Sequence, residues 1–401
     1  MTAQARPSLL FYCQHSLGMG HLVRSLTLAA AFSERFRVVV LSGGALPDCV
    51  RLPSSVELLE LPPIGLDHER QLVSRSGTEL SKAKIRRQEM VLDAYSSLRP
   101  SAVVIELFPF GRKKFAGELL PLLERAANDP SLPVIVCSLR DILVPRSDHD
   151  TLTSAKRANR YFDAVLVHSD PAFARLEESF RSPTTLDVPI HYTGFVTNSQ
   201  SQVPAERPSR PRILVSAGGG IVGEALLSKA VDAFRLVRAT DDIEMKVIAG
   251  PFLPQPAWER LVGKAGGYEG LIFERSVPEL LPELLQATAS ISQCGYNTTL
   301  ELLRSGIPAL VVPFEQVKET EQMNRAQKLT HMGALRMLRE QEMTAQRLAD
   351  EIRAVLSFRP KRPNLNFQGA VNSLRIIDEL VRNSDSRPMS LSLIGTRRAA
   401  Q

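Results

Sequence analysis

The most constraining feature of this chain is an alternation of short apolar runs with helical patterns, which occurs twice along the sequence. The first series of apolar runs is SLLFYC, RVVVLSG, SAVVIELF, LPVIVCSL and AVLVHS, with helix-forming stretches such as HLVRSLTLAAAFSERF and AGELLPLLERAAND between them. Strands that are apolar throughout are typical of a parallel sheet that is covered on both faces. The alternation therefore predicts a doubly wound α/β domain.

The alternation of apolar runs and helical patterns stops near residue 194, where the chain becomes polar and rich in proline (GFVTNSQSQVPAERPSRPR). It restarts at RILVSAGG. Apolar runs and helical patterns then alternate again as far as PALVVP. The length of 401 residues also exceeds what one ordinary core holds. We predict an N-terminal α/β domain over residues 1–195, a linker over 196–210, a second α/β domain over 211–380 and a disordered tail over 381–401.

Composition excludes several classes of protein. The four cysteines are far apart and form no CxxC pair, which argues against a disulfide framework or a zinc site and fits a reducing compartment. No apolar run approaches the roughly 20 residues needed to span a bilayer. The net charge of +6 permits an anionic substrate or a membrane surface as a partner but requires neither. No RNA-binding motif or zinc finger is present, so we expect no nucleic-acid partner.

A first glycine turn, HSLGMGHLVRS, follows a predicted strand and opens a predicted helix. Gly18 and Gly20 fit the first two positions of a dinucleotide fingerprint, but Val23 occupies the third. The second strand ends in LSGG, without an acid for a ribose, and no GK[ST] of a P-loop follows. The turn instead presents His21 at a helix start, where a histidine either acts as a general base or merely caps the helix.

A second glycine turn, VSAGGGIVGEALL, has the same placement in the second domain. It contains Ser216 and the glycines Gly218, Gly219 and Gly220. Backbone amides at the start of a helix bind phosphate oxygens, whereas a tight turn with close packing is the alternative explanation.

A third turn, in SQCGYNTTLELLRSGIPALVVP, places Gly295, Asn297 and Thr298 at another predicted helix start. Glu301 follows one turn later on the face of Asn297. A carboxylate beside a phosphate site suits the two hydroxyls of a ribose, because it accepts hydrogen bonds with both oxygens. An ordinary solvated glutamate is the alternative.

Further polar residues end other predicted strands. Glu321 and Gln322 follow PALVVP and offer hydrogen-bond partners for sugar hydroxyls. Glu106 ends SAVVIELF, and Arg140 with Asp141 ends LPVIVCSL. Open α/β sheets bind ligands at the carboxyl ends of their strands, so these three residues are candidates for the acceptor side, with solvated loop charges as the alternative. Four further residues give the first domain basic character, which would suit a lipid-linked or membrane-bound acceptor, although we expect solvated surface charges: Arg86, Arg87, Lys113 and Lys114.

Taken together, these motifs resemble those of the GT-B glycosyltransferases. QCGYNTTLELLRSGIPALVVP is similar to the HCGWNSTLE signature of UDP-dependent plant glycosyltransferases, and the glycine loops and the later EQ resemble MurG-type enzymes. GMGHLVRSLTLA resembles the UDP-sugar hydrolase of pseudaminic acid synthesis. The overall likeness is to a group of uncharacterised bacterial predicted glycosyltransferases. The resemblance implies GT-B architecture, with two Rossmann-like domains facing across a cleft.

The resemblance also implies roles for residues. Glu301 would hold the ribose, and Glu321 and Gln322 would reach the donor sugar. The backbone around Ser276 and Val277 would meet the base and favour uracil. The diphosphate would lie against helix starts and glycine loops, formed by Gly18, Gly20, Ser216, Gly218, Gly219, Gly220, Gln293, Gly295, Asn297 and Thr298.

Two positions depart from the relatives. Gln293 replaces a phosphate-binding histidine, so that contact would be neutral, and Arg325 replaces an asparagine. The arginine would either add a charge for phosphate or alter the donor pocket. These departures leave the donor sugar open.

The expected activity is inverting transfer of a hexosyl or N-acetylhexosaminyl group from a UDP-sugar to an acceptor hydroxyl, in polysaccharide or glycoconjugate biosynthesis. His21 and Glu106 are the predicted catalytic residues. No metal and no cofactor other than the UDP-sugar co-substrate is expected, in keeping with the lack of an Asp-x-Asp motif near a predicted strand end. The acceptor is open, a lipid-linked compound or a saccharide, and the expected location is the cytoplasm, with peripheral contact at the inner membrane face permitted. The alternatives are a UDP-sugar hydrolase and a non-catalytic protein that binds nucleotide sugars.

Overall fold

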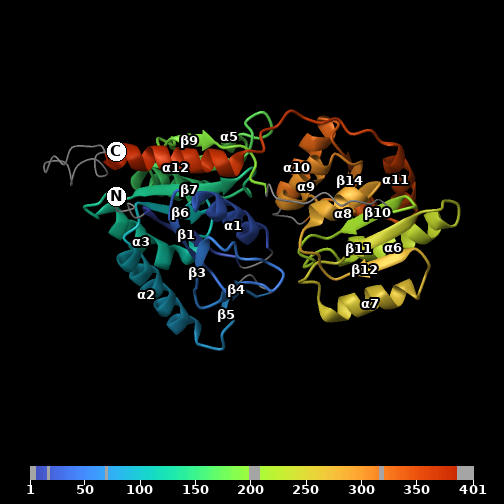
Figure 1. Cartoon of the computed structure of the whole chain (residues 1–401), viewed down its shortest axis with the longest axis horizontal. Coiled ribbons are helices and arrows are strands. Elements are labelled where there is room, and N and C mark those ends of the chain that lie inside the picture. The colour runs from blue at the N-terminus through green and yellow to red at the C-terminus, as the bar shows by residue number, and fades with distance from the viewer. Residues whose placement is uncertain (1–5, 16–18, 68–70, 198–207, 316–319, 386–401) are drawn as a thin grey trace, which may run out of the picture. The chain divides into compact units, whose positions relative to one another are not determined.

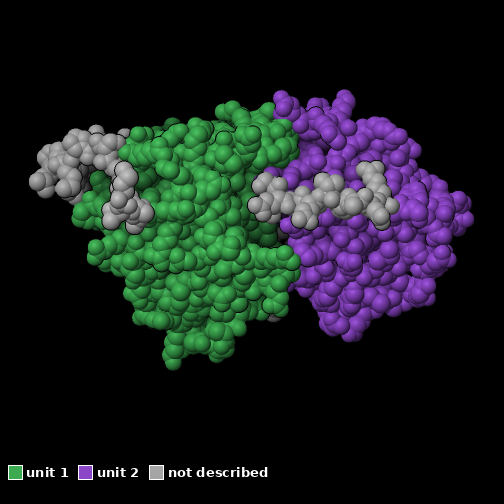
Figure 2. All heavy atoms as spheres, in the orientation of Figure 1, with its two compact units in different colours: residues 1–196, 365–401 green, residues 197–364 purple. Residues whose placement is uncertain are grey.

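The computed structural model describes residues 6–15, 19–67, 71–197, 208–315 and 320–385. The chain divides into two compact units (Figure 2). Unit 1 comprises Met1–Val196 together with Leu365–Gln401, and unit 2 comprises Thr197–Asn364. Both units are α/β, as the alternation of runs predicts.

Among its described residues, unit 1 has a seven-stranded sheet in the order β3-β2-β1-β6-β7-β8-β9, and neighbouring strands are parallel throughout. A small antiparallel pair, β4 with β5, lies outside it. The order reverses between β1 and β6, so the loops that follow these two strands lie side by side. The strands are β1 (Ser8–Cys13), β2 (Arg37–Ser42), β3 (Val56–Glu60), β4 (Ile64–Leu66), β5 (Leu72–Ser74), β6 (Ala102–Glu106), β7 (Val134–Arg140), β8 (Ala164–His168) and β9 (Ile190–Tyr192).

Helices cover both faces of this sheet (Figure 1). Side chains of a strand alternate between faces, so Leu10 and Tyr12 pack in one core cluster and Leu9 and Phe11 in the other. The first cluster includes residues of α2, α3 and α4, and the second includes residues of α1 and α12. The helices are α1 (Gly20–Phe32), α2 (Leu80–Leu98), α3 (Ala116–Ala127) after a 3-10 turn η1 (Lys113–Phe115), α4 (Asp148–Tyr161), α5 (Leu176–Ser179) and α12 (Gly369–Asp385).

The C-terminal helix α12 belongs to unit 1, which corrects the predicted end of the second domain at residue 380. The backbone amide of Phe195 donates to the carbonyl of Asn366 at 2.7 Å, and Asn372 donates to the carbonyl of Thr193 at 2.8 Å. Ile377 of α12 is fully buried in the core of unit 1. The helix also runs to Asp385, so the disordered tail predicted from residue 381 starts too early, and residues 386–401 lie outside the described part. The linker prediction falls largely on residues 198–207, which are likewise outside it.

Unit 2 repeats the plan, with a described sheet in the order β12-β11-β10-β13-β14-β15 and parallel neighbours. One face packs against α6, α7 and α11 in a single core cluster. The strands are β10 (Arg212–Ser216), β11 (Glu244–Ile248), β12 (Leu271–Glu274), β13 (Ala289–Ser292), β14 (Ala309–Val311) and β15 (Arg336–Met337). The helical elements are α6 (Glu224–Arg238), α7 (Gln255–Ala265), α8 (Leu280–Gln286), α9 (Tyr296–Ser305), α10 (Glu321–His331), η2 (Glu340–Glu342) and α11 (Ala345–Ser357).

The expected surface position of Arg87 is wrong. Its side chain is fully buried, and its Nε donates to Glu118 at 2.8 Å. Its guanidinium also donates to the side chain of Gln14 and to the carbonyl of Pro62. A buried arginine needs such partners because the charge is costly to remove from water. The pair of Arg87 and Glu118 therefore fastens α2 and α3 to the end of β1.

Among the helices that the structure describes, none combines the length and the apolar character that a membrane span requires.

Candidate active site

Glu106 lies at the carboxyl end of β6 and is the centre of a network of charged side chains. Its carboxylate is fully buried and lies 2.5 Å from Nδ1 of His21. Arg24 donates to the same carboxylate oxygen at 2.8 Å, and Arg112 donates to the other oxygen at 3.2 Å. The network joins α1, which follows β1, to the segment after β6, as the reversal of strand order between β1 and β6 allows. The two predicted catalytic residues are thus in contact.

The charges of this network fix the protonation of His21. Burial by itself would raise the pKa of Glu106, but His21, Arg112 and Arg24 together hold that pKa well below its usual range. Burial lowers the pKa of His21 to about 4, and the two arginines add to this against the opposing effect of Glu106. The imidazole is therefore neutral at neutral pH. Because the carboxylate next to Nδ1 is ionised, Nδ1 carries the proton and Nε2 carries the lone pair.

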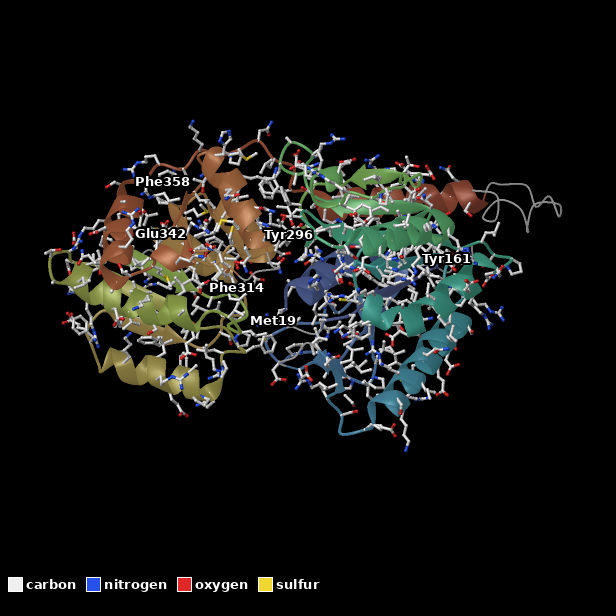
Figure 3. All side chains as sticks on the ribbon, turned by 180° about the vertical axis from the view of Figure 1, so that it is seen from behind. Met19, Tyr161, Tyr296, Phe314, Glu342 and Phe358 are labelled. Atoms are coloured by element: carbon white, nitrogen blue, oxygen red, sulfur yellow. The ribbon has the colours of Figure 1, made fainter. Side chains whose placement is uncertain are left out.

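The side chain of His21 keeps access to solvent. The side chain is 18% exposed, and within the described residues Nε2 has no hydrogen-bond partner. A neutral imidazole held by a carboxylate through one nitrogen can take a proton at the other. Figure 3 labels Met19, the residue before α1, which marks the start of the helix that carries His21.

Arg24 and Arg112 are functional candidates that sequence reasoning missed. Arg24 is three residues after His21 and so lies on the same face of α1, which is a signal the sequence contains. Arg112 gives no such signal, because it returns to Glu106 through a loop in which Leu107 and Arg112 have φ values of 67° and 56°. Non-glycine residues rarely adopt this left-handed region, and such positions gather at functional sites.

The other acceptor-side candidates end the neighbouring strand. Asp141 is 1% exposed and Arg140 is half-buried, so neither is a solvated loop charge. Their roles stay predictions. Gly20 begins α1, whereas Gly18 lies outside the described residues.

In unit 2, the second and third glycine turns lie next to each other at the carboxyl ends of β10 and β13. A Cβ placed on Gly218 would have Thr298 Oγ1, at 3.8 Å, as its nearest neighbour, and the φ of Gly218 is 59°. Gly220 differs, because a Cβ there would lie 2.7 Å from the carbonyl oxygen of Ala249. Gly220 thus serves close packing, the alternative weighed for this loop, while a Cβ on Gly218 would make only an ordinary contact with Thr298 and one on Gly295 would meet nothing within 4 Å.

Glu301 is half-buried on α9, five residues after the first residue of that helix, Tyr296 (labelled in Figure 3). Within the described residues its carboxylate has no hydrogen bond and no ion pair. Burial raises its pKa to about 7; Arg304 opposes this and Glu279 adds to it. A carboxylate that is costly to ionise and lacks a donor is placed to accept hydrogen bonds from a ligand.

Three polar residues beside this helix hold the loops together. Gln293 is buried, and its side-chain amide donates to the carbonyl of Val222 at 3.1 Å. Gln322 accepts from the backbone amides of Cys294 at 3.0 Å and Phe314 at 3.2 Å. Arg325 is 1% exposed and donates to the carbonyl of Cys294 at 2.7 Å. These side chains fix the backbone in front of α9, a use that the sequence did not suggest for them.

The remaining predicted donor residues also follow strands of unit 2. Ser216 ends β10 and is buried, and Ser276 and Val277 come after β12. Gly295 precedes α9, and Asn297 is in its first turn. Glu321 is the first residue of α10. Because parallel strands end at one side of a sheet, all of these residues lie at the same side of unit 2 as Gly218 and Thr298.

Comparison with known proteins agrees with this arrangement. Residues 262–377 match the family described as "Glycosyltransferase family 28 C-terminal domain". One curated relative is the UDP-N-acetylglucosamine--N-acetylmuramyl-(pentapeptide) pyrophosphoryl-undecaprenol N-acetylglucosamine transferase of Shouchella clausii, which is 24% identical over 78% of this chain and 86% of its own. The enzyme of the same name from an Anaeromyxobacter species is 32% identical over 25% of this chain and 27% of its own.

Solved structures share the fold. The crystal structure of Acinetobacter baumannii MurG is similar with a TM-score of 0.57 and 15% identity, over 93% of this chain and all of the other. The predicted GT-B fold is therefore confirmed. Together with the family match over residues 262–377, it indicates a glycosyltransferase similar to MurG. The alignment covers 27% of the length of the Anaeromyxobacter enzyme and 86% of the length of the Shouchella clausii enzyme.

Proposed function

We propose that the protein is an inverting, metal-independent glycosyltransferase that moves a hexosyl or N-acetylhexosaminyl group from a UDP-sugar to an acceptor hydroxyl. The observation that carries the proposal is the contact between His21 and Glu106, which leaves Nε2 of a neutral imidazole available as a base. The printed name of the curated relatives supplies the first donor to try, UDP-N-acetylglucosamine, and a pyrophosphoryl lipid as the first class of acceptor.

In this mechanism Nε2 of His21 takes the proton of the acceptor hydroxyl. The acceptor oxygen forms a bond to the anomeric carbon from the side opposite the leaving group, and the bond from that carbon to the diphosphate oxygen breaks. Attack from the opposite side inverts the anomeric configuration. The imidazolium that forms is stabilised by the carboxylate of Glu106, which stays ionised beside it.

Unit 2 would bind the donor. Glu301 would accept hydrogen bonds from the two ribose hydroxyls. The diphosphate would lie against the loop of Gly218 and the start of α9, where a Cβ on Gly295 would meet nothing within 4 Å. The amide groups at the start of α9 and the positive end of its dipole would stabilise the departing UDP. Ser276 and Val277 would meet the base, and Glu321 would reach the sugar. A cytoplasmic location with peripheral membrane contact is part of the same proposal.

The test is a thermal-shift panel with the UDP, GDP, TDP and ADP forms of glucose and N-acetylglucosamine, followed by UDP release from any sugar that binds. A ligand at about 100 times its Kd adds about 2.7 kcal/mol to the free energy of unfolding, which is easily measured. We expect stabilisation by the UDP compounds and UDP release that depends on an added acceptor, such as a lipid extract. Stabilisation by another base alone would contradict the donor assignment.

Two outcomes would replace transfer by one of its alternatives. UDP release at full rate without any acceptor indicates a hydrolase, in which His21 activates water. Tight UDP binding without turnover under any condition, unchanged in His21→Ala, indicates a non-catalytic binding protein.

A further inference from the structure

A pocket of about 390 Å³ in unit 1 contains an excess of positive charge. It lies between the segment after β6 and the start of α4. Its titratable lining comprises two lysines, two arginines, one histidine and one aspartate: Lys113, Lys114, Arg146, Arg157, His149 and Asp150. Thr153 and Ser154 add hydroxyl groups to the wall. Of these lining residues, Lys113 and Lys114 are the two considered above, either for a lipid-linked acceptor or as solvated charges.

Two of these cations form no ion pair among the described residues. Asp150, the lining carboxylate, forms its ion pair with Lys113 at 3.0 Å and acts on Arg146 only from beyond ion-pair distance. Arg146 and Arg157 are half-buried, and within the described residues neither forms an ion pair with a carboxylate. The guanidinium of Arg157 instead lies 5.8 Å from the ring centroid of Phe108. Half-buried guanidinium groups are costly without an anion, so their placement together around a cavity indicates that an anion completes the site.

The pocket adjoins the network around Glu106. Its wall includes Pro109 and Lys113, which flank Arg112, and the hydroxyl of Ser154 donates to the carbonyl of Pro109 at 2.8 Å. Burial lowers the pKa of Arg146; the negative charge of Asp150 opposes this, and the nearby positive charge of Arg112 adds to it. A positive charge of the network therefore acts on a residue of the pocket.

We infer that this pocket binds a phosphoryl group of the acceptor. Guanidinium groups match phosphate oxygens with paired hydrogen bonds, and the hydroxyl of Thr153 supplies a further donor. The inference rests on the proposed glycosyl transfer, and it adds where on unit 1 the acceptor is held. The phosphoryl group belongs either to a water-soluble acceptor or to a lipid-linked one, and the two share this chemistry.

The experiment is calorimetric titration of the UDP-saturated protein with two probes, inorganic pyrophosphate and farnesyl diphosphate. Saturation with UDP keeps the probes out of the donor site. We expect both probes to bind, and Arg146→Gln and Arg157→Gln each to weaken binding by roughly tenfold or more, the usual effect of losing a charge-assisted hydrogen bond. Arg160→Gln is the matched control, since Arg160 is on α4, as Arg157 is, but pairs with Glu124 outside the pocket. It should leave binding unchanged.

A second measurement separates loss of a ligand contact from loss of folding. Removal of a half-buried cation that forms no ion pair among the described residues should leave the melting temperature of Arg146→Gln equal to or above that of the wild type, while probe binding is lost. UDP binding should be the same in all variants, so a failure of the donor assignment is visible independently. Much tighter binding of farnesyl diphosphate than of pyrophosphate indicates a lipid-linked acceptor, and equal binding a soluble one.

The inference is overturned if neither probe binds, or if both bind equally well to the wild type and the two glutamine variants. It is also overturned if phosphatidylglycerol vesicles bind the wild type and both variants alike while neither probe binds. That result would show a basic surface for membranes rather than a pocket for a phosphoryl group.

Discussion

The two sheets end in loops of opposite character. At the carboxyl ends of β1 and β6, His21, Arg24 and Arg112 surround Glu106, so the protein supplies the partners of that buried carboxylate itself. At the carboxyl ends of β10 and β13, Glu301 is half-buried and has no hydrogen-bond donor among the described residues, and a Cβ on Gly295 would meet nothing within 4 Å. The first arrangement fixes protonation states before any ligand arrives, and the second leaves groups for a ligand to complete. A site for chemistry and a site for binding are thus built by different physical means.

The largest effect in this comparison is expected from removal of the base. His21→Ala should lower the rate of transfer by about 10²- to 10⁴-fold, the usual contribution of a general base, and leave the Kd of UDP unchanged. Rates are measured as UDP release and affinities by calorimetry. His191→Ala, in β9, is the control and should have wild-type activity. Equal loss of UDP binding in His21→Ala would show that the two sets of residues do not have separate tasks.

The carboxylate of Glu106 should matter for stability as well as for rate. Glu106→Gln leaves the buried guanidinium of Arg24 without its anion, which should lower the free energy of unfolding by about 3–5 kcal/mol. Chemical denaturation measures this. The exposed pair of Arg37 with Glu57 is the control, because Glu57→Gln should cost about 1 kcal/mol or less. If Glu106→Gln lowered the free energy of unfolding as little as Glu57→Gln does, the network around Glu106 would not be preorganised.

Glu301 should show the opposite behaviour, since it is costly without its ligand. Its folded pKa lies above that of the unfolded chain, so ionisation destabilises the free protein as pH rises through about 7. At pH 8, Glu301→Gln should therefore raise the free energy of unfolding by on the order of 1–3 kcal/mol. The same variant should weaken UDP binding by roughly tenfold to a hundredfold. Glu259→Gln, on the surface of α7, should change neither quantity; a Glu301→Gln variant that binds UDP normally would refute the ribose role.

The rate, which depends on His21, and the affinity for UDP, which depends on Glu301, should also respond differently to pH. This is the smallest effect that we expect. His21 has a lowered pKa of about 4, so its base form persists as pH falls from 8 to 5 and the rate at saturating donor should stay nearly constant. Glu301 takes up a proton near pH 7, so the Kd of UDP should rise about tenfold between pH 8 and pH 6. Affinity and rate are measured over the same buffers. If the rate fell together with the affinity for UDP as pH is lowered, the difference between the pKa values of His21 and Glu301 would be contradicted.

Much of the fold could be predicted from local patterns. The run SLLFYC is β1 without a change of boundary, and the predicted helix near 297–304 is α9 with one residue added at each end. Such elements are visible because burial on both faces leaves a continuous apolar run. The elements at the far end were less visible: α12 was assigned to the second domain, because nothing in its own sequence shows that it packs on α1.

The candidate site was predictable as a set of positions and not as a set of contacts. Glycine turns after strands indicated the second and third loops, and they also indicated His21. That Gly220 serves packing depends on Gly250, thirty residues away, whose backbone approaches Gly220, whereas a Cβ on Gly218 would meet only Thr298. Likewise, Gln322 was expected at a sugar, but its side-chain oxygen accepts from the backbone of two different loops.

By itself, the sequence determined the succession of strands and helices, the division into two α/β halves and the positions of the turns, because apolar periodicity and glycine are local properties of the chain. Only the tertiary structure decided that Glu106 meets His21, that Arg87 is buried and that Arg146 and Arg157 share a cavity. Those pairings depend on which strand ends become neighbours when the order of the sheet reverses, and on side chains from distant segments that neutralise one another away from water. The protonation of His21, and with it the proposed chemistry, follows from these tertiary contacts.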